Sequence, residues 1–334
     1  MKAVGLYQYL PIDNQDSLQD LDIENPTATG RDLLVEVKAI SVNPVDTKVR
    51  APKTKVEEAP RILGWDAAGT VVAAGEAVTA YQVGDDVFYA GDITKPGTNS
   101  EFHLVDERIV GAKPKSLGFA EAAALPLTSI TAWEALFDRL SISKTGEDAG
   151  KSILIIGGAG GVGSIAIQLA NQVAKLFVTA TASRPETVDW CQQLGADAVI
   201  NHRQDLAQQL DAADYILCLN NTDMHWRAMT QIIKPQGLIC SIVENAQPLD
   251  LDLLKSKSAG FVWEFMFTRS MYQTVDMDEQ RKLLNEISQL IDSQVLRTTC
   301  KDVVRPINAK TLRQVHGRIE QGSMIGKVVL ADWA

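Results

Sequence analysis

ILIIGGAGGVGSIAIQLA, residues Ile153–Ala170, joins two apolar runs of different period through a cluster of glycines. The first run is typical of a buried strand, and the second has the spacing of a helix. Between them, Gly158, Gly160 and Gly163 satisfy the pattern GxGxxG. Such glycines permit a tight turn, let the backbone approach a pyrophosphate and let helix and strand pack closely. The stretch therefore predicts a dinucleotide-binding turn, and the alternative is a glycine-rich turn without a ligand.

The start of the predicted helix supplies the phosphate ligands. A helix N-terminus carries backbone N–H groups without intrahelical partners and a partial positive charge, so it attracts anions. We expect the N–H groups of Gly160, Gly161 and Val162 to bind the pyrophosphate.

The end of the second predicted strand, LFVTATASRPE, indicates which dinucleotide binds. A site that prefers NAD places Asp or Glu about 20 residues beyond the glycines, to bind the ribose 2′-OH. Here Ala182, Ser183 and Arg184 occupy this place without a carboxylate. A hydroxyl and a guanidinium suit a 2′-phosphate, so the sequence predicts NADP(H). The alternative is an ordinary solvated loop. His202, after the third strand, is a second candidate for this phosphate or a polar loop residue.

The composition limits the class of protein. The chain has 334 residues, 46% of them hydrophobic, and a formal net charge of −10. Such an acidic chain is not expected to bind nucleic acid or an anionic membrane. No apolar run reaches the length of a membrane span, and the N-terminus lacks the features of a secretory signal. The four cysteines are far apart, which is typical of reduced thiols, so we expect a cytoplasmic protein.

The pattern of elements changes along the chain. Short alternating runs in the first ~120 residues predict a partly open β barrel. Their bounds are Leu33–Val42, Ala67–Gly75, Val83–Gly91 and Ser100–Asp106. From residue 152, strands and helices alternate, which predicts a doubly wound parallel sheet. The closing GKVVLAD reads as a strand like those of the first region, so we expect the tail to return there.

Several segments together resemble the medium-chain dehydrogenase/reductase superfamily, in its zinc-free quinone oxidoreductase branch, and more narrowly bacterial proteins named zinc-type alcohol dehydrogenase-like. They are SVNPVDTKVR (41–50), ILGWDAAGTV (62–71), VGDDVFYAG (83–91), AALPLTSITAWEAL (123–136), GGAGGVGSIAIQLA (157–170), LGADAVINH (194–202) and GKVVL (326–330). The resemblance implies a GroES-like β domain at 1–122 and 263–334. It also implies an inserted Rossmann domain at 123–262.

The resemblance also locates the positions of a catalytic zinc. Zinc-dependent relatives bind this metal through Cys, His and Cys or Asp. Their first cysteine corresponds to about Asn43 here, and their histidine corresponds to Trp65 in the segment Gly64–Asp66. No cysteine precedes Cys191, so the four-cysteine structural lobe is also missing. We therefore predict no metal.

The resemblance implies roles for further side chains. Asn43 is expected to bind the substrate oxygen or the nicotinamide region, and Asp46 and Thr131 complete the predicted catalytic set. The alternatives are that Asp46 caps and holds the loop and that Thr131 bonds a backbone carbonyl of its own helix. Thr128, Asn220 and Lys327 are expected at the cofactor. The predicted apolar wall of the substrate pocket, for which core packing is the alternative, comprises Trp65, Phe88, Tyr89 and Phe265.

Without a metal, reduction of an electron-poor acceptor is easier than oxidation of an alcohol. The sequence therefore predicts NADPH-dependent hydride transfer to a quinone or an α,β-unsaturated carbonyl. The alternatives are an alcohol or aldehyde dehydrogenase and a non-enzymatic NADPH-binding redox sensor. Relatives commonly pair through their Rossmann sheets, so we expect a homodimer with its edge strand near Gly237–Val243.

Overall fold

The computed structural model describes residues 1–334 and shows two units. Unit 1 comprises Met1–Leu127 and Phe267–Ala334, and unit 2 comprises the intervening Thr128–Met266. Unit 2 is thus inserted into the sequence of unit 1. The chain passes from unit 1 to unit 2 after residue 127 and returns after residue 266. The bounds expected from the sequence, 122/123 and 262/263, lie a few residues earlier. The first crossing lies inside helix α3 (Pro126–Trp133), which begins at the proline that interrupts the preceding helical stretch.

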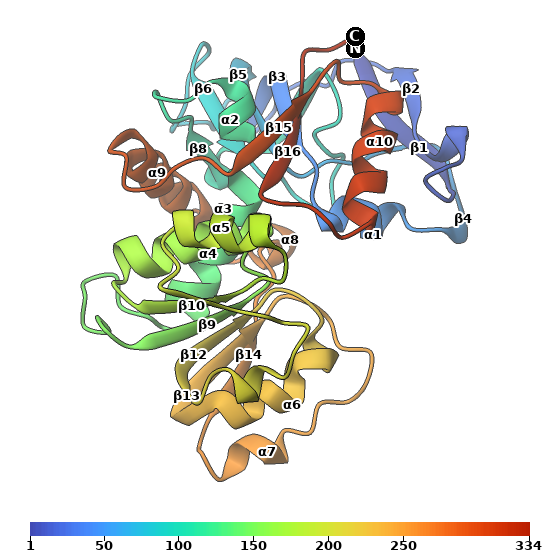
Figure 1. Cartoon of the computed structure of the whole chain (residues 1–334). Coiled ribbons are helices and arrows are strands. Elements are labelled where there is room, and N and C mark those ends of the chain that lie inside the picture. Colours follow the sequence, from blue (N-terminus) through green and yellow to red (C-terminus); the bar gives the residue numbers. More distant parts are fainter. The chain divides into compact units, whose positions relative to one another are not determined.

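Unit 1 is rich in strands, as its alternating runs predict. The strands are β1 (Lys2–Tyr9), β2 (Gln19–Asp22), β3 (Asp32–Ser41), β4 (Lys53–Ile62), β5 (Ala67–Ala74), β6 (Asp86–Tyr89), β7 (Phe102–Asp106), β8 (Val110–Ala112), β15 (Cys300–Val304) and β16 (Lys327–Ala331). A seven-stranded sheet has the order β15-β16-β3-β5-β6-β8, with β7 also paired to β3, and a three-stranded sheet has the order β2-β1-β4. Strand β16 pairs antiparallel with β3, which confirms that the tail returns to the N-terminal sheet (Figure 1).

The helices of unit 1 cover these sheets. They are α1 (Pro44–Arg50), α2 (Phe119–Ala123), α8 (Thr268–Tyr272), α9 (Glu279–Asp292) and α10 (Ala309–Glu320), with short 3-10 turns η1 (Gln15–Ser17) and η2 (Glu107–Ile109). Helix α9 buries Leu284, Ile287 and Ile291 along one face, as its amphipathic sequence predicts. A Cβ atom at Gly111 of β8 would lie 2.5 Å from Cβ of Leu284, so this glycine allows α9 to pack closely on the strand.

Unit 2 contains a six-stranded parallel sheet. Its strands are β9 (Ser152–Ile156), β10 (Phe177–Thr181), β11 (Ala198–Ile200), β12 (Ala213–Cys218), β13 (Ile233–Ser241) and β14 (Gly260–Trp263). Their order is β11-β10-β9-β12-β13-β14, the doubly wound arrangement that the alternating elements predict. From β9 the chain adds β10 and β11 on one side. It then crosses back over β9 and adds β12, β13 and β14 on the other side.

Helices connect these strands on both sides of the sheet. They are α4 (Gly161–Gln168), α5 (Pro185–Gln193), α6 (Thr222–Ile232) and α7 (Asp252–Lys255), with the 3-10 turn η5 (Leu206–Gln208) and the π-helical segments η3 (Glu134–Arg139) and η4 (Leu169–Val173). Right-handed crossovers in opposite directions place α4 and α5 on one side and α6 on the other (Figure 1).

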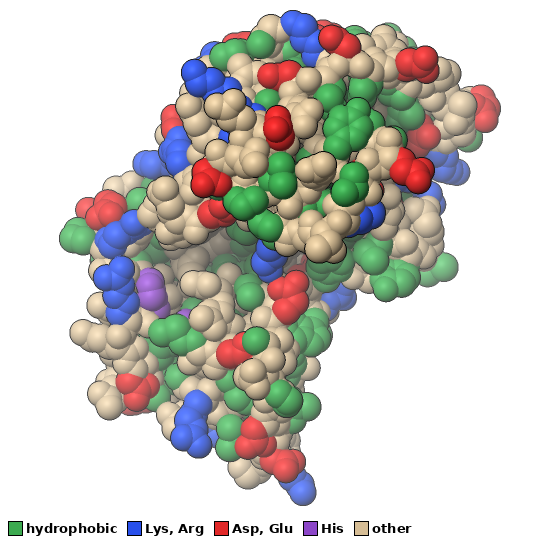
Figure 2. Space-filling model, turned by 90° about the vertical axis from the view of Figure 1, so that its right-hand side faces the viewer, with side chains coloured by type: hydrophobic (Ala, Val, Ile, Leu, Met, Phe, Trp, Pro, Cys, Tyr) green, Lys and Arg blue, Asp and Glu red, His purple; other side chains and the backbone are tan.

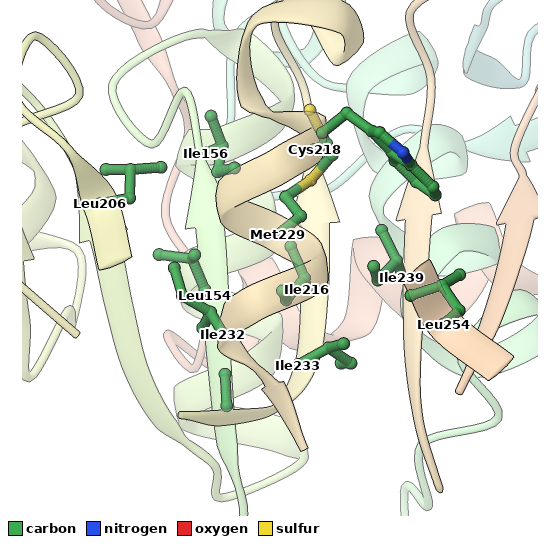
Figure 3. Packing of buried hydrophobic residues seen from close by; sticks show 12 residues of the cluster. Leu154, Ile156, Leu206, Ile216, Cys218, Met229, Ile232, Ile233, Ile239 and Leu254 are labelled. Carbon is green, nitrogen blue, oxygen red and sulfur yellow. The ribbon is translucent and has the colours of Figure 1, made fainter. Parts of the chain in front are cut away.

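A hydrophobic cluster fixes α6 on the sheet. Figure 3 shows Met229 and Ile232 of α6 over Leu154 of β9 and Ile216 of β12, and all four side chains are buried. Because a strand buried on both faces reads as a continuous apolar run, SILII and ADYILC are strands of the sheet interior.

The prediction of the edge strand is wrong. Gly237–Val243 falls largely in β13, which is paired on one side with β12 and on the other with β14. The apolar run LICSIV is therefore an internal parallel strand, and β14 forms this edge of the sheet.

No helix combines the length and the apolar character needed to cross a membrane. On the face shown in Figure 2, acidic and basic side chains are interspersed, without a continuous basic area. This distribution agrees with the net charge of −10.

Candidate functional site

The glycine turn of unit 2 lies between β9 and α4, at the carboxyl end of the first strand. Gly157 takes the left-handed conformation, with a φ of +90°, and so makes the turn. A Cβ atom at Gly163 would lie 2.4 Å from the carbonyl oxygen of Gly157, so Gly163 is the glycine that brings helix and strand together. At Gly160 a Cβ atom would have no neighbour closer than 3.6 Å. Gly160 is therefore the position where the backbone is open to a ligand.

Three side chains hold this turn in place. The hydroxyl of Ser164 donates to the carbonyl oxygen of Gly160 at 2.7 Å, and Nε1 of Trp190 donates to the Ser164 hydroxyl at 2.8 Å. On the other side, the N–H of Gly157 donates to Oγ1 of Thr181 at 3.0 Å. The turn that precedes α4 is thus hydrogen-bonded to β10 through Thr181 and to α5 through Trp190. The first N–H groups of α4 are held in fixed positions, which suits binding of a pyrophosphate.

The predicted 2′-phosphate ligands follow β10 and β11. These strands are parallel neighbours, so their carboxyl ends lie at the same edge of the sheet. Ser183 and Arg184 are partly exposed, and Nε of Arg184 pairs with Oε1 of Glu186 at 3.1 Å. No carboxylate occupies the strand end itself, since Glu186 is the first acidic residue after β10.

His202 lies after β11 at this same edge. Its side chain is partly exposed, and its buried Nδ1 has no hydrogen-bond partner. Burial lowers the pKa of His202, and the charge of Arg203 lowers it further. Burial likewise lowers the pKa of His225, a buried neighbour on α6. His202 therefore offers a neutral ring nitrogen with spare bonding capacity beside the basic Arg203.

Asn220 and the two threonines complete the predicted positions in unit 2. Asn220 follows β12 and is exposed. A Cβ atom added at Gly157 would lie 3.6 Å from the Cβ atom of Asn220, so Asn220 lies beside the glycine turn. Thr128 and Thr131 are one turn apart on α3, and both are buried. The structure thus gathers the glycines, Ser183, Arg184, His202 and Asn220 at one edge of the sheet.

Unit 1 brings the remaining predicted polar residues together in a buried cluster. Asn43 precedes Pro44, which begins α1, and the N–H of Asn43 donates to Oδ2 of Asp46 at 2.6 Å. Nδ2 of Asn43 donates to Oδ2 of Asp66 at 2.8 Å. The second carboxylate oxygen of Asp66 accepts the N–H of Leu127 at 2.8 Å. Asp66 is therefore central to this cluster, although the resemblance indicated it only as part of the segment Gly64–Asp66, where zinc-dependent relatives carry a histidine ligand.

Lys327 at the start of β16 completes the cluster. Its Nζ donates to the carbonyl oxygen of Val42 at 3.0 Å, to Oδ2 of Asp66 at 3.0 Å and to Oδ1 of Asn43. Because an ammonium has three N–H donors, these bonds leave none for a cofactor phosphate. The position of Lys327 thus indicates a role inside unit 1 in place of the predicted cofactor contact.

The charges of the cluster balance only in part. Asp46, Asp66 and Lys327 are all at least 96% buried. Burial raises the pKa of Asp46 to about 7, although the N–H of Asn43 and the charge of Lys327 lower it. Burial also raises the pKa of Asp66, and the charge of Lys327 opposes this effect. One ammonium therefore neutralises one of two carboxyl groups, and a proton on Asp46 can neutralise the other near neutral pH.

Three of the predicted pocket aromatics are covered by protein. Phe88 and Tyr89 are 0% exposed and Trp65 is 1% exposed. Trp65 packs edge-to-face on Phe267 with ring centroids 6.2 Å apart, and the hydroxyl of Tyr89 lies 3.2 Å from Nδ1 of His103. These contacts place the three rings in the core of unit 1, whereas Phe265 in unit 2 is 45% exposed.

The side chains present do not fit a zinc ion. No group of three or more His, Cys, Asp or Glu residues lies close enough to hold a metal. At the position of the first expected ligand stands Asn43, and both carboxylate oxygens of Asp66 are engaged by protein donors. Zinc prefers thiolate and imidazole ligands, which are missing here.

Comparisons with known proteins match this architecture. The alcohol dehydrogenase GroES-like domain family matches residues 29–133, and the zinc-binding dehydrogenase family matches residues 194–330. A zinc-type alcohol dehydrogenase-like protein of Staphylococcus aureus is 44% identical over 334 residues, covering 99% of both chains. An NADPH-dependent alkenal/one oxidoreductase of Arabidopsis thaliana is 38% identical over 187 residues, which cover 53% of this chain and 47% of that protein.

Two solved structures extend the likeness to the whole fold. A putative zinc-dependent alcohol dehydrogenase from Rhizobium etli has a TM-score of 0.96 and 50% identity, covering 100% of this chain and 98% of the other. A quinone oxidoreductase from Coxiella burnetii has a TM-score of 0.82 and 25% identity, covering 99% of both chains.

Proposed function

Because the chain belongs to the medium-chain dehydrogenase/reductase superfamily, we propose that it reduces quinones or α,β-unsaturated carbonyls with NADPH and without a metal ion. The observation that carries this proposal is the polar cluster of unit 1, in which Asn43, Asp66 and Lys327 satisfy one another. These residues do not form a Lewis-acid site that would polarise an alcohol. An acceptor that is already electron-poor needs no such activation.

The cofactor assignment rests on the strand ends of unit 2. A bound NADPH supplies the hydride, and a proton from water completes the reduction of the acceptor. The open backbone at Gly160 and the first N–H groups of α4 bind the pyrophosphate. Ser183, Arg184 and His202 bind the 2′-phosphate. Arg184 exchanges its contact with exposed Glu186 for the phosphate, and this exchange costs little because an exposed ion pair contributes ~1 kcal/mol or less.

The acceptor class is supported by the named relatives. The Arabidopsis protein is an alkenal/one oxidoreductase, and the Coxiella protein is a quinone oxidoreductase. Both reactions add hydride to a conjugated, electron-poor system. We therefore assign this class of acceptor to the chain, in preference to a saturated alcohol.

The test is a comparison of three reactions on protein purified without chelator. NADPH is mixed with a quinone or with an alkenal, and NADP⁺ is mixed with a primary alcohol. We expect NADPH oxidation in the first two mixtures, at rates that a chelator leaves unchanged. Alcohol oxidation that the chelator abolishes would instead support an alcohol dehydrogenase. NADPH binding without turnover of any acceptor would support a non-enzymatic binding protein.

A further inference from the structure

The Lys327 ammonium occupies the centre of the unit 1 cluster. It is 4% exposed and is bonded to oxygens from three separate positions: Val42, Asn43 and Asp66. Val42 and Asn43 are the two residues between β3 and α1, Asp66 precedes β5, and Lys327 itself comes from β16. The ammonium thus joins three segments of the sheet region: Val42–Asn43, Asp66 and β16.

By the resemblance, zinc-dependent relatives carry metal ligands at about Asn43 and at Trp65, the residue before Asp66. We propose that Lys327 takes the place of a metal ion in this cluster, because its ammonium neutralises Asp66, binds Asn43 and excludes a divalent cation. This inference concerns unit 1 alone and does not depend on which acceptor is reduced.

The chemistry of the oxygens supports this exchange. A carboxylate, an amide oxygen and a backbone carbonyl are ligands of hard divalent cations, and all three are directed at Nζ of Lys327. A second carboxylate, that of Asp46, lies one hydrogen bond away through the N–H of Asn43. Loss of the ammonium would leave the buried carboxylate of Asp66 without a compensating positive charge, which is strongly unfavourable unless a proton or a cation replaces it.

The experiment removes the ammonium and offers Mn²⁺ as the probe. Lys327→Ala shortens the side chain and vacates its place, Lys327→Met keeps the volume without the charge, and Lys327→Arg keeps the charge. The matched control is Lys234→Ala, because Nζ of Lys234 also pairs with an aspartate, Asp214, at 2.8 Å, but this pair is partly exposed and in unit 2. Bound Mn²⁺ is counted by electron spin resonance, and the thermal midpoint is measured with and without Mn²⁺.

We expect Lys327→Ala to bind about one Mn²⁺ per chain, at least tenfold more tightly than the wild type or Lys234→Ala, and to gain thermal stability from it. Lys327→Met and Lys327→Arg should bind no more than the control. The double variant Lys327→Ala/Asp66→Asn should lose the gain, because a carboxylate ligand is gone.

Two results would overturn the proposal. One is stoichiometric uptake of Mn²⁺ or Zn²⁺ by the wild type at this cluster, shown by its loss in Asp66→Asn. The other is a Lys327→Ala variant that binds Mn²⁺ no better than Lys234→Ala. If Lys327→Ala is unfolded, circular dichroism decides the question: the proposal requires Mn²⁺ to restore the fold, and failure to restore it counts against the proposal.

Discussion

The two glycines Gly160 and Gly163 provide a matched pair of substitutions that separates cofactor binding from folding. Alanine at Gly160 adds a Cβ whose nearest neighbour would lie at 3.6 Å, and the φ of −72° is accessible to any L-residue. Alanine at Gly163 adds a Cβ at 2.4 Å from the carbonyl oxygen of Gly157. The first substitution therefore fits the free protein, whereas the second forces the backbone apart.

The expected magnitudes follow from these distances. For Gly160→Ala, the loss of glycine at the N-cap costs ~1 kcal/mol of stability or less. The added methyl group occupies the space through which the pyrophosphate approaches, so we expect NADPH to bind at least tenfold more weakly, or ~1.4 kcal/mol. For Gly163→Ala, overpacking costs about 1–3 kcal/mol, which the better helix propensity of alanine offsets by ~1 kcal/mol or less.

The assay combines urea unfolding with calorimetric titration of NADPH for both variants. Gly160→Ala should keep its unfolding midpoint near that of the wild type and lose affinity. Gly163→Ala should unfold at lower urea, whatever its affinity. If Gly160→Ala binds NADPH with the parental Kd, the pyrophosphate does not contact this turn, and the assignment of the site is wrong.

Other perturbations test separate parts of the structure. Arg184→Ala should weaken NADPH binding about tenfold, or ~1.4 kcal/mol, and leave NADH unchanged in calorimetry, whereas equal losses would exclude a 2′-phosphate contact. Asn43→Ala should lower both kcat/KM, by about 10–100-fold, and the unfolding midpoint, because Lys327 loses an acceptor; parental values of both would contradict the cluster. Burial lowers the pKa of His103 from 6.5 to about 4. At this site the unfolded chain therefore binds more protons in this range, and the contribution of His103 to the free energy of unfolding should fall by roughly 3 kcal/mol as the pH falls from 6.5 to 4. His103→Gln should lose this contribution, so that its free energy of unfolding in urea titrations falls less than that of the wild type between pH 6.5 and 4. We also propose a homodimer, now through edge strand β14; light scattering should show a dimer, and Trp263→Lys, at a position 43% exposed, should give a monomer near 36.4 kDa.

The local features of the fold were predictable because they depend on residues close together in sequence. The glycine turn and the alternating strands and helices of the parallel sheet follow from period, spacing and turn residues. The edge strand was not predictable in this way. A run such as LICSIV reads the same in the interior of a sheet and at its edge, and only the pairing of β13 with β14 distinguishes them.

The same limit applies to the polar cluster of unit 1. Asn43 and Asp46 were recognised through the resemblance, because both lie in the short segment SVNPVDTKVR. Asp66 and Lys327 come from positions distant from this motif and from each other, and the resemblance assigned Lys327 to the cofactor. Only the pairing of β16 with β3 brings the lysine to Asn43 and Asp66.

This pairing of the last strand with the third has a consequence for synthesis on the ribosome. Every strand of unit 2 is available before residues 267–334 are made, whereas β3 waits for β16 until residues 327–331 have been made. During this interval the nascent chain holds an open sheet edge and two carboxyl groups, on Asp46 and Asp66, whose cation has not yet emerged. We expect a chain terminated before Lys327 to remain bound to chaperones or to aggregate, although it contains the whole dinucleotide-binding unit.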